Sequence, residues 1–335
     1  MNSKNNTSIS ICILRLSSIG DITHIIPIIS TLQKSIIDCD ITWIIGKTEY
    51  ELVKNLNDIN FIVMDKNKTL DSMFGMHKFS KNMPFDIVLH MQKSLRSKLI
   101  GKMIKGKINV TFNDINTDKS HVVENFFSFL KKINIKNKFL DWQTGSMLNM
   151  NYIEEINVNK FVPYVVINPF TSSRVNNYRE WDYDNYGTIA EYLFNEYSIN
   201  TFFLGKVSND KKDKFSEHIK SSSNIVNLIN ETTLIEMFSV LSKCKFYIGP
   251  DSGALHMANM LNLPIIGLYA TSNPLRTGPY LNQKYVINKY NEAMLKFLNK
   301  ETNDIKWGER VRDKDAMKLI SLNDVKNKIK EIING

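Results

Sequence analysis

The feature that most constrains the fold of this chain is an alternation of short β-type runs with longer helix-type segments. The strand-like runs of its first half are ISICILRL, ITWIIG, FIVM and FDIVLHM. The segments between them, such as IIPIISTLQKSI and YELVKNL, are amphipathic with helical spacing. This alternation predicts βα units that form a parallel, doubly wound sheet.

A second series of strand-like runs follows a polar section, rich in Asn and Lys, from about Asn134 to Lys160. Its runs are YVVINPF, TFFLG, NIVNLI, FYIGPDSG and PIIGLYA. The 335 residues exceed the roughly 250–300 at which one hydrophobic core stops growing. We therefore expect two Rossmann-like α/β domains with a cleft between them. The final segment predicts an amphipathic helix with Ser321 as its cap and Asp324 three positions later.

The charge balance limits the partners that this chain can have. Its 43 Lys and Arg exceed its 34 Asp and Glu, which favours phosphates, acidic lipid surfaces or nucleic acid. A solvated Lys-rich surface is an equally good explanation. We expect no nucleic-acid partner, because no helix-turn-helix, zinc-finger or RNP-like signature is present.

Compartment and membrane topology also follow from composition. The cysteines Cys12, Cys39 and Cys244 are an odd count without CxxC spacing, which indicates a reducing compartment and no disulfide framework. No segment reaches the roughly 18 apolar residues of a membrane span, and the first apolar run is too short for a signal peptide. We therefore expect a cytoplasmic protein.

The sharpest chemical signal lies at the end of a strand in the second half, in YIGPDSGALHMANMLNLPIIGLY. Here Asp251, Ser252 and Gly253 open a predicted helix. Free backbone N–H groups and the helix dipole at such a start bind a diphosphate, and Gly253 allows the ligand to approach. Simple capping of the helix by Asp251 or Ser252 explains the pattern equally well.

A second cluster, NPFTSSRVNNYREWDYDNYG, follows the strand YVVI. It places hydroxyl and guanidinium groups in a loop before a helix that begins near Asp182. Such groups suit a ligand that carries phosphate, because Arg offers forked donors to its oxygens. Solvation alone would also account for arginines in a polar loop. The side chains concerned are Thr171, Ser172, Ser173, Arg174 and Arg179.

The segment SSIGDITH, at the junction of the first strand with the first helix, contains Asp21. A carboxylate at this junction could accept a proton from an attacking hydroxyl group, which is the role of a general base. The same residue could instead cap the helix that contains Ile25 and Ile26. His24, near an apolar face, is expected to be structural.

These motifs together resemble glycosyltransferase family 9, whose best-known members are the ADP-heptose:lipopolysaccharide heptosyltransferases. The resemblance rests on LRLSSIGDITHIIPI, FDIVLHMQKSLRSKL, INPFTSSRVNNYREWDYDNYG and the long segment from YIGPDSG to RTGPY, in that order. The tail WGERVRDKDAMKLISLNDV looks like that of heptosyltransferase-I-like members. The similarity spans nearly the whole chain.

The resemblance implies an α/β GT-B fold, in which two Rossmann-like domains have parallel sheets facing an interdomain cleft. Residues 1–160 would bind the acceptor and residues 161–315 the nucleotide sugar. The C-terminal helix, in 316–335, is expected to pack back toward the N-terminal domain.

By motif, the resemblance assigns roles to individual residues. Asp21 matches the family's proposed catalytic base, and Arg179 falls where a Lys or Arg before Trp meets the donor diphosphate. Thr171 belongs to the same phosphate loop. The donor-side motif, which usually has Thr at the position of Ser252, is matched by Asp251, Ser252, Gly253 and His256. The acceptor side is matched by Ser18, Gly20, Gln92, Arg96 and Lys119, although the segment around Lys119 lacks the Arg frequent in relatives.

The activity that the resemblance implies is inverting transfer of a heptose from ADP-heptose to the Kdo or inner-core region of a lipopolysaccharide precursor. The partners would be the nucleotide sugar, an anionic glycolipid such as Kdo-lipid A, and the cytoplasmic face of the inner membrane, bound peripherally. No cofactor or essential metal is expected, since Asp38-Cys39-Asp40 and Asp182-Tyr183-Asp184 have the DxD form but suit loops and caps. The alternatives are a GT-B enzyme with another nucleotide-sugar donor, a nucleotide-sugar epimerase, or a non-catalytic nucleotide-sugar-binding module.

Overall fold

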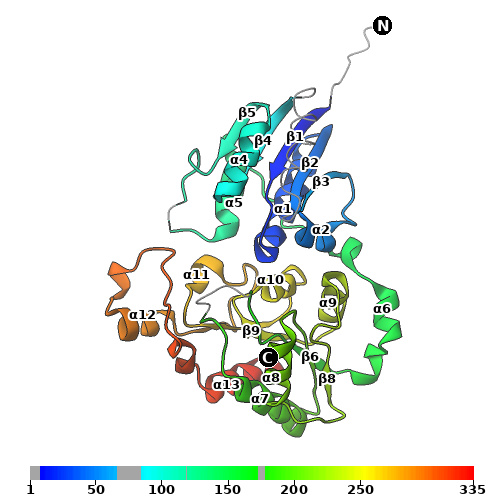
Figure 1. Cartoon of the computed structure of the whole chain (residues 1–335), viewed down its shortest axis with the longest axis vertical. Helices are drawn as coiled ribbons and strands as arrows, with labels where there is room; N and C mark the ends of the chain where they lie inside the picture. Colours follow the sequence, from blue (N-terminus) through cyan, green and yellow to red (C-terminus); the bar gives the residue numbers. More distant parts are fainter. Residues whose placement is uncertain (1–7, 66–83, 118, 173–177) are drawn as a thin grey trace. The chain divides into compact units, whose positions relative to one another are not determined.

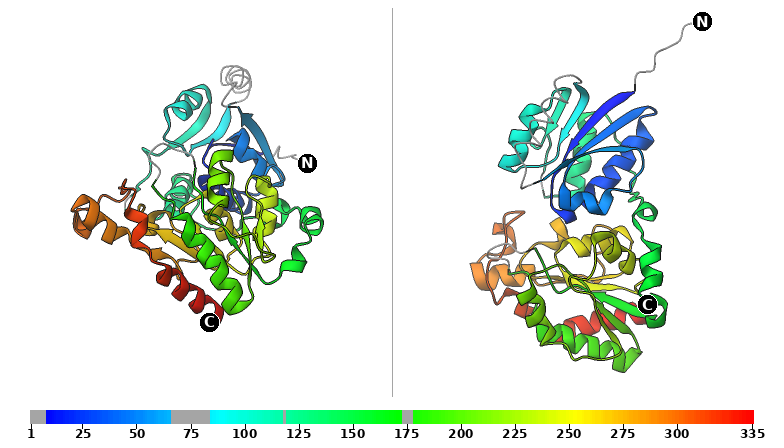
Figure 2. Two further views of the ribbon diagram at one scale, coloured as in Figure 1. Left: turned by 60° about the horizontal axis from the view of Figure 1, so that its bottom comes forward. Right: turned by 45° about the vertical axis from the view of Figure 1, so that its right-hand side comes forward.

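The chain folds as two compact units, Met1–Met147 and Leu148–Gly335, in a computed structural model (Figure 1). The structure describes residues 8–65, 84–117, 119–172 and 178–335. Each unit contains one parallel β-sheet, and helices flank the sheet (Figure 2). The expected α/β class with two Rossmann-like halves is therefore confirmed.

The sheet of the first unit has five strands in the order β3-β2-β1-β4-β5. Its strands are β1 (Ile9–Leu14), β2 (Cys39–Gly46), β3 (Ile59–Met64), β4 (Phe85–His90) and β5 (Gly106–Thr111). Its helices are α1 (Ile19–Ser35), α2 (Lys47–Val53), α4 (Leu95–Met103), α5 (Val122–Lys132) and the 3-10 helix η1 (Thr144–Met147). All four strand pairings are parallel.

Both faces of the central strand β1 are covered. Successive side chains of a strand point to opposite faces, so Cys12 and Leu14 share one face, where they cluster with Ile100 and Ile104 from the segment of α4. The helix α1 is buried along most of its length. Because β1 and α1 are both largely buried, the side chains of this segment that a ligand can contact lie mainly in the loop between them.

The sheet of the second unit has six strands in the order β11-β10-β9-β6-β7-β8. They are β6 (Tyr164–Ile167), β7 (Asn200–Phe203), β8 (Ile225–Asn227), β9 (Tyr247–Pro250), β10 (Ile265–Tyr269) and β11 (Ile287–Asn288). The helices are α6 (Met150–Glu155), α7 (Tyr183–Tyr197), α8 (Asn209–Ser216), α9 (Leu234–Leu241), α10 (Gly253–Met260), α11 (Pro274–Thr277), α12 (Tyr290–Leu298) and α13 (Leu322–Asn334). Three 3-10 helices are η2 (Val158–Phe161), η3 (Thr302–Asp304) and η4 (Ala316–Leu319).

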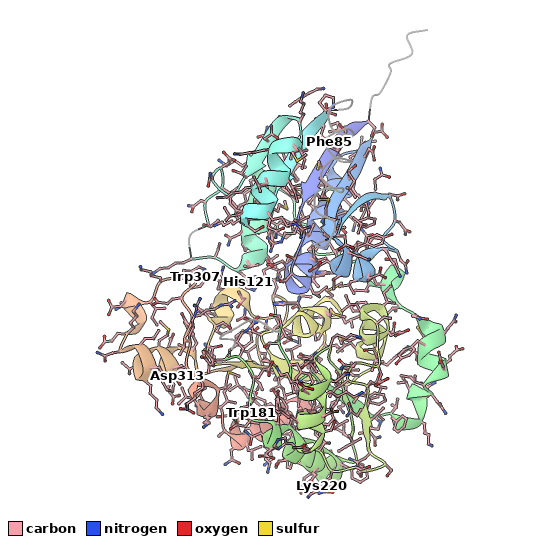
Figure 3. All side chains as sticks on the ribbon, in the orientation of Figure 1. Phe85, His121, Trp181, Lys220, Trp307 and Asp313 are labelled. Carbon is pink, nitrogen blue, oxygen red and sulfur yellow. The ribbon has the colours of Figure 1, made fainter. Side chains whose placement is uncertain are left out.

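The C-terminal helix α13 packs on the core of the second unit. Ser321 caps α13 and Asp324 completes a capping box, as the sequence predicts. The apolar residues Val325 and Ile329, however, are buried in the core of the second unit, where α13 packs on α7 and β10. Trp181, labelled in Figure 3, fixes the preceding segment, because its indole N–H donates to the carbonyl of Ile320 at 2.9 Å. The apolar side of this helix therefore belongs to the second unit, and packing of 316–335 toward the N-terminal domain stays a prediction.

The two units divide between Met147 and Leu148, earlier in the chain than the predicted 160/161 boundary. Trp142 donates its indole N–H to the carbonyl of Thr23 in α1 at 2.8 Å. The backbone N–H of Asn149, in contrast, donates to Ser239 Oγ in α9 at 2.7 Å, and α6 packs on α9. Part of the polar section from Asn134 to Lys160 therefore belongs to the second unit.

Hydrophobic helices and cysteines can be located among the described residues. Within the described ranges, no helix combines the length and the hydrophobicity that crossing a bilayer requires. The three cysteines are free thiols, of which Cys12 and Cys244 are buried.

The packing of α13 makes a testable prediction. Ile329→Ala should lower the free energy of unfolding of the second unit by about 2–5 kcal/mol, because it removes a fully buried side chain from the core. Denaturant unfolding combined with hydrogen exchange would show lost protection in β6 and α7 but not in β1. The matched control Lys330→Ala removes an exposed neighbour and should change little. Lost protection in β1 instead would contradict this assignment of α13.

Candidate active site

Three predicted site residues, Asp21, Thr171 and Asp251, lie in loops or helix starts where the chain order of a sheet reverses. In the first sheet, β1 pairs with both β2 and β4, and in the second, β6 pairs with both β7 and β9. The loops that leave such a strand pair diverge, which opens a crevice at the carboxyl ends of the strands. The β1–β4 pair carries the loop of Asp21, and the β6–β9 pair carries those of Thr171 and Asp251.

Asp21 occupies the first turn of α1, where it makes the capping contacts that the sequence predicts, and its role as a base stays a prediction. Its Oδ2 accepts hydrogen bonds from Ser18 N at 3.2 Å and Ser18 Oγ at 3.0 Å, which caps the helix. The same oxygen forms an ion pair with Arg15. Oδ1 takes part in none of these contacts, and the side chain is 32% exposed. Asp21 is therefore a helix cap whose carboxylate also reaches solvent.

Arg15 is a functional candidate that the sequence analysis missed. Its side chain is 10% exposed, Nη1 donates to the carbonyl of Met91 at 2.5 Å, and the guanidinium lies 5.4 Å from the ring centre of Phe126. A charged residue inside the apolar run ILRL was the available signal. These contacts hold the guanidinium in place, so its pairing with Asp21 orients the carboxylate.

The acceptor-side candidates have different roles in the structure. Gln92 Oε1 accepts from Leu16 N at 2.7 Å, so this amide supports the loop that leads to Asp21. Arg96 lies on α4 and donates to the carbonyl of Asp65 at 3.1 Å. The others are Ser18 as the N-cap of α1, Gly20 within its first turn, and Lys119 as an exposed residue before α5. Their contact with an acceptor stays a prediction.

In the second unit, Asp251 is the centre of a buried polar cluster. Its carboxylate accepts from Ser272 Oγ at 2.9 Å, lies 3.5 Å from Arg179 Nη1 and lies 3.7 Å from His256 Nε2. Burial raises the pKa of this carboxyl, but His256, Arg179 and Ser272 outweigh burial and hold the pKa at about 2. Asp251 is therefore a permanent anion at neutral pH. Ser272 follows β10 and was not predicted from the sequence.

The start of α10 has the features of an anion-binding site. Ser252 is the N-cap, and its Oγ accepts from Leu255 N at 3.4 Å. Gly253, the first helical residue, is partly exposed. The first N–H groups of a helix have no partner within it, and the helix dipole adds positive charge at this end. Capping and anion binding are therefore compatible at this position.

Arg179 connects this helix start to the loop after β6. Its Nη1 donates to the carbonyl of Asp251 at 2.8 Å, and Nη2 lies 3.4 Å from Ser172 Oγ. The predicted candidates Ser173 and Arg174 lie outside the described residues. The structure therefore brings together Arg179, Ser172 and the Asp251-Ser252-Gly253 segment at one edge of the second sheet.

Glu180 organises the same loop and was also missed by the sequence analysis. Its Oε1 accepts from Thr171 N at 2.8 Å and from Thr171 Oγ at 3.0 Å. Lys211 donates to this carboxylate at 2.7 Å, and Tyr183 donates to it at 3.2 Å. Since Glu180 follows Arg179 directly, one short segment anchors the loop and supplies the guanidinium.

The two DxD sequences belong to local structure. Asp182 is the N-cap of α7, and Asp184 pairs with His218 at 2.5 Å. Asp40 accepts from Asn60 Nδ2 at 2.6 Å at the start of β2. In the part of the chain that the structure describes, no group of three or more His, Cys, Asp or Glu is placed to hold a metal ion.

Comparison with known proteins identifies the family. The profile described as Glycosyltransferase family 9 (heptosyltransferase) matches residues 76–306. The chain belongs to glycosyltransferase family 9. It is 26% identical to the lipopolysaccharide core heptosyltransferase OpsX of Haemophilus influenzae over 344 residues, which cover 96% of each chain. The predicted family is confirmed, and the protein is a glycosyltransferase.

Solved structures show the same fold. The family 9 glycosyltransferase of Veillonella parvula superposes with a TM-score of 0.74 at 17% identity, over 99% of both chains. The Escherichia coli heptosyltransferase WaaC with ADP gives 0.72 at 15% identity, over 97% of this chain and 100% of that one. The two parallel sheets of this family 9 enzyme are therefore those of the GT-B fold.

The depressed pKa of Asp251 predicts how the stability of this glycosyltransferase depends on pH. At pH values above the ordinary pKa of 3.8, the lowered pKa of Asp251 contributes stability to the folded state. This contribution is lost as the pH falls toward about 2. Between about pH 6 and pH 2, wild-type protein should lose about 2 kcal/mol more stability than Asp251→Asn. Denaturant unfolding of both proteins across this range is the measurement. Parallel stability curves would contradict the prediction.

Proposed function

We propose that this enzyme transfers a heptose from ADP-heptose to the Kdo or inner-core region of a lipopolysaccharide precursor, with inversion at the anomeric carbon. The observation that carries the proposal is the start of α10, where Arg179 is held beside Ser252 and Gly253. Similarity to OpsX over nearly the whole chain supports the sugar and the acceptor class.

The donor diphosphate would bind at the start of α10. Its oxygens would accept from the N–H groups of the first turn and from Arg179, and Thr171 and Ser172 would line the same anion site. Diphosphate charge rises as the sugar bond breaks, so fixed donors stabilise the transition state more than the ground state. Asp251, as an anion, donates no hydrogen bond to the diphosphate; its carboxylate accepts from Ser272 Oγ and holds Arg179 in place.

The base in the proposed reaction is Asp21. Its carboxylate would take the proton of an acceptor hydroxyl while that oxygen forms a bond to the anomeric carbon of the heptose. The bond from this carbon to the diphosphate oxygen breaks at the same time, and ADP leaves with both electrons of that bond. A single displacement of this kind inverts the anomeric centre and needs one base.

The acceptor would be an anionic glycolipid such as Kdo-lipid A, met by the cationic side chains on the acceptor side, Arg96 and Lys119. Its acyl chains stay in a bilayer, so we further propose peripheral association with the cytoplasmic face of the inner membrane. The net charge of +9 supports this, since each Lys or Arg near an anionic lipid surface contributes about 1 kcal/mol. We expect no cofactor, because Arg179 and the α10 N–H groups supply positive charge to the leaving group.

The experiment that tests the function begins with calorimetric titration of the purified protein with ADP and with UDP. It continues with ADP-heptose and Kdo-lipid A in buffer containing EDTA, followed by mass spectrometry of the product. Selective ADP binding and a heptose-sized mass gain on the acceptor are expected. Tighter binding of UDP, an epimerised sugar formed without acceptor, or ADP binding without transfer would reject the proposal.

Substitution of the two central residues should separate chemistry from binding. Asp21→Ala should lower kcat by about 10²–10⁴ with little change in donor affinity, because it removes the base together with its cap of α1 and leaves the donor site in the second unit intact. Arg179→Ala should weaken ADP binding and also lower kcat by about 10²–10³, because it removes a diphosphate donor. Steady-state kinetics with ADP titration measures both quantities. Wild-type turnover in Asp21→Ala would remove this residue from the mechanism.

Arg15 acts through Asp21 and should behave as a positioning residue. Arg15→Met keeps the side-chain bulk but frees the carboxylate from its ion pair, so kcat should fall by about tenfold or more while the KM for donor stays similar. Arg15→Lys retains a cation and should recover part of the loss. In the Asp21→Ala background, Arg15→Met should have no further effect on kcat. An additive loss in the double variant would show that Arg15 serves the fold alone.

A further inference from the structure

The helix α4 has one face packed on the sheet and an opposite face open to solvent. Ser97 and Ile100 are buried, and Ile100 belongs to the cluster that contains Cys12 and Leu14 of β1. Leu95 and Leu99, in contrast, are 80% and 56% exposed. Two exposed leucines one turn apart on a nine-residue helix form an apolar strip that folding of the monomer does not bury.

The same exposed face carries positive charge. Lys98 and Lys102 are exposed, and their spacing from Leu95 and Leu99 places all four side chains on one side of the helix. The chain has six Lys or Arg and no Asp or Glu from 87 to 113. Among the described residues, no carboxylate forms a salt bridge with Lys98 or Lys102. We call Leu95, Lys98, Leu99 and Lys102 the α4 face.

We propose that the α4 face docks this enzyme on an anionic lipid bilayer. The proposal rests on the proposed function, in which the acceptor is a glycolipid, and names the surface that meets its membrane. Position along the chain supports the assignment, because two of the acceptor-side candidates, Gln92 and Arg96, flank the start of α4. An acceptor whose acyl chains remain in the bilayer requires the docking surface to lie close to the residues that bind its head group.

The chemistry of the α4 face suits a lipid surface better than it suits a second copy of the chain or a nucleic acid. Leucines enter the boundary between head groups and acyl chains, while lysine stems extend along it and keep their ammonium groups at the phosphates. A second copy of the chain would bring like charges together at the same face. A nucleic acid would meet the lysines but leave the leucines without a partner.

The test is sedimentation of the full-length protein with vesicles of phosphatidylcholine and phosphatidylglycerol, compared with phosphatidylcholine alone. Wild-type protein should bind the anionic vesicles, and more weakly at high salt. Lys98→Gln with Lys102→Gln should weaken binding about 25-fold, about fivefold for each lysine. Leu95→Ser with Leu99→Ser should weaken it by about tenfold. Absence of wild-type binding to the anionic vesicles would overturn the proposal.

Matched controls separate a docking face from a general effect of charge or hydrophobicity. Lys131→Gln with Lys136→Gln removes two exposed lysines of the same unit, and Leu275→Ser with Leu295→Ser removes two leucines that are 59% and 55% exposed. Both control variants should bind vesicles like the wild type. Equal losses in controls and α4 variants would overturn the proposal, as would wild-type self-association that the α4 variants abolish.

A final comparison keeps this proposal distinct from the proposed function. The α4 variants should retain turnover with a water-soluble acceptor that lacks acyl chains and lose it with acceptor in anionic vesicles. If neither acceptor is glycosylated by the wild type, the proposed function fails while vesicle binding still tests the docking face. Equal turnover of wild type and α4 variants on vesicle-bound acceptor would overturn the docking role.

Discussion

The rest of the structure depends on parallel pairing at two strand pairs, β1 with β4 and β6 with β9. Parallel strands end at the same edge of a sheet, and the chain reverses its direction of winding at each of these pairs. The strand register decides which residues lie opposite each other at these strand ends: Leu14 pairs with His90, and Ile167 pairs with Ile248. Loops that leave these residues are brought within hydrogen-bonding distance although they lie about 80 residues apart in sequence.

An arginine joins the two loops in each unit by a similar arrangement. Arg15, after β1, donates to the carbonyl of Met91 after β4 and pairs with Asp21. Arg179, after β6, donates to the carbonyl of Asp251 after β9 and lies beside the carboxylate of the same residue. Guanidinium suits this task because its donors diverge in one plane and it keeps its charge when buried. Each arginine therefore fixes a loop and a functional group together.

The sequence predicted secondary structure where the signal lies within one short continuous segment. Apolar runs identified β1, β2, β3, β4 and the five strands from β6 to β10, but the edge strands β5 and β11 were missed. The segment GKINVT of β5 is too polar to stand out, and β11 has two residues. The packing of α13 could not be predicted because an amphipathic helix does not specify the surface that covers its apolar side.

The candidate site likewise contains features that the sequence predicts and contacts that it does not. The helix start at Ser252 and the junction at Asp21 were predictable, since strand, turn and helix are contiguous there. The contacts of Glu180 with Lys211 and of Ser272 with Asp251 join residues 31 and 21 positions apart, which depends on the folded sheet. Arg15 was hidden for a related reason, since its side chain is held by the carbonyl of Met91, which follows the neighbouring strand β4.

The environments of two carboxylates explain why Asp21, and not Asp251, is the candidate base. Asp251 directly follows the central strand β9, Asp21 lies in the first turn of the helix that follows the central strand β1, and both contact an arginine. Asp251 is 8% exposed, is bonded to Ser272, and has a pKa of about 2, so it is a weak proton acceptor with no open approach. Asp21 is 32% exposed and makes its contacts through Oδ2. A base must reach the proton that it removes, so the difference in exposure favours Asp21 over Asp251 as the proposed base, while Asp251 holds Arg179 in place.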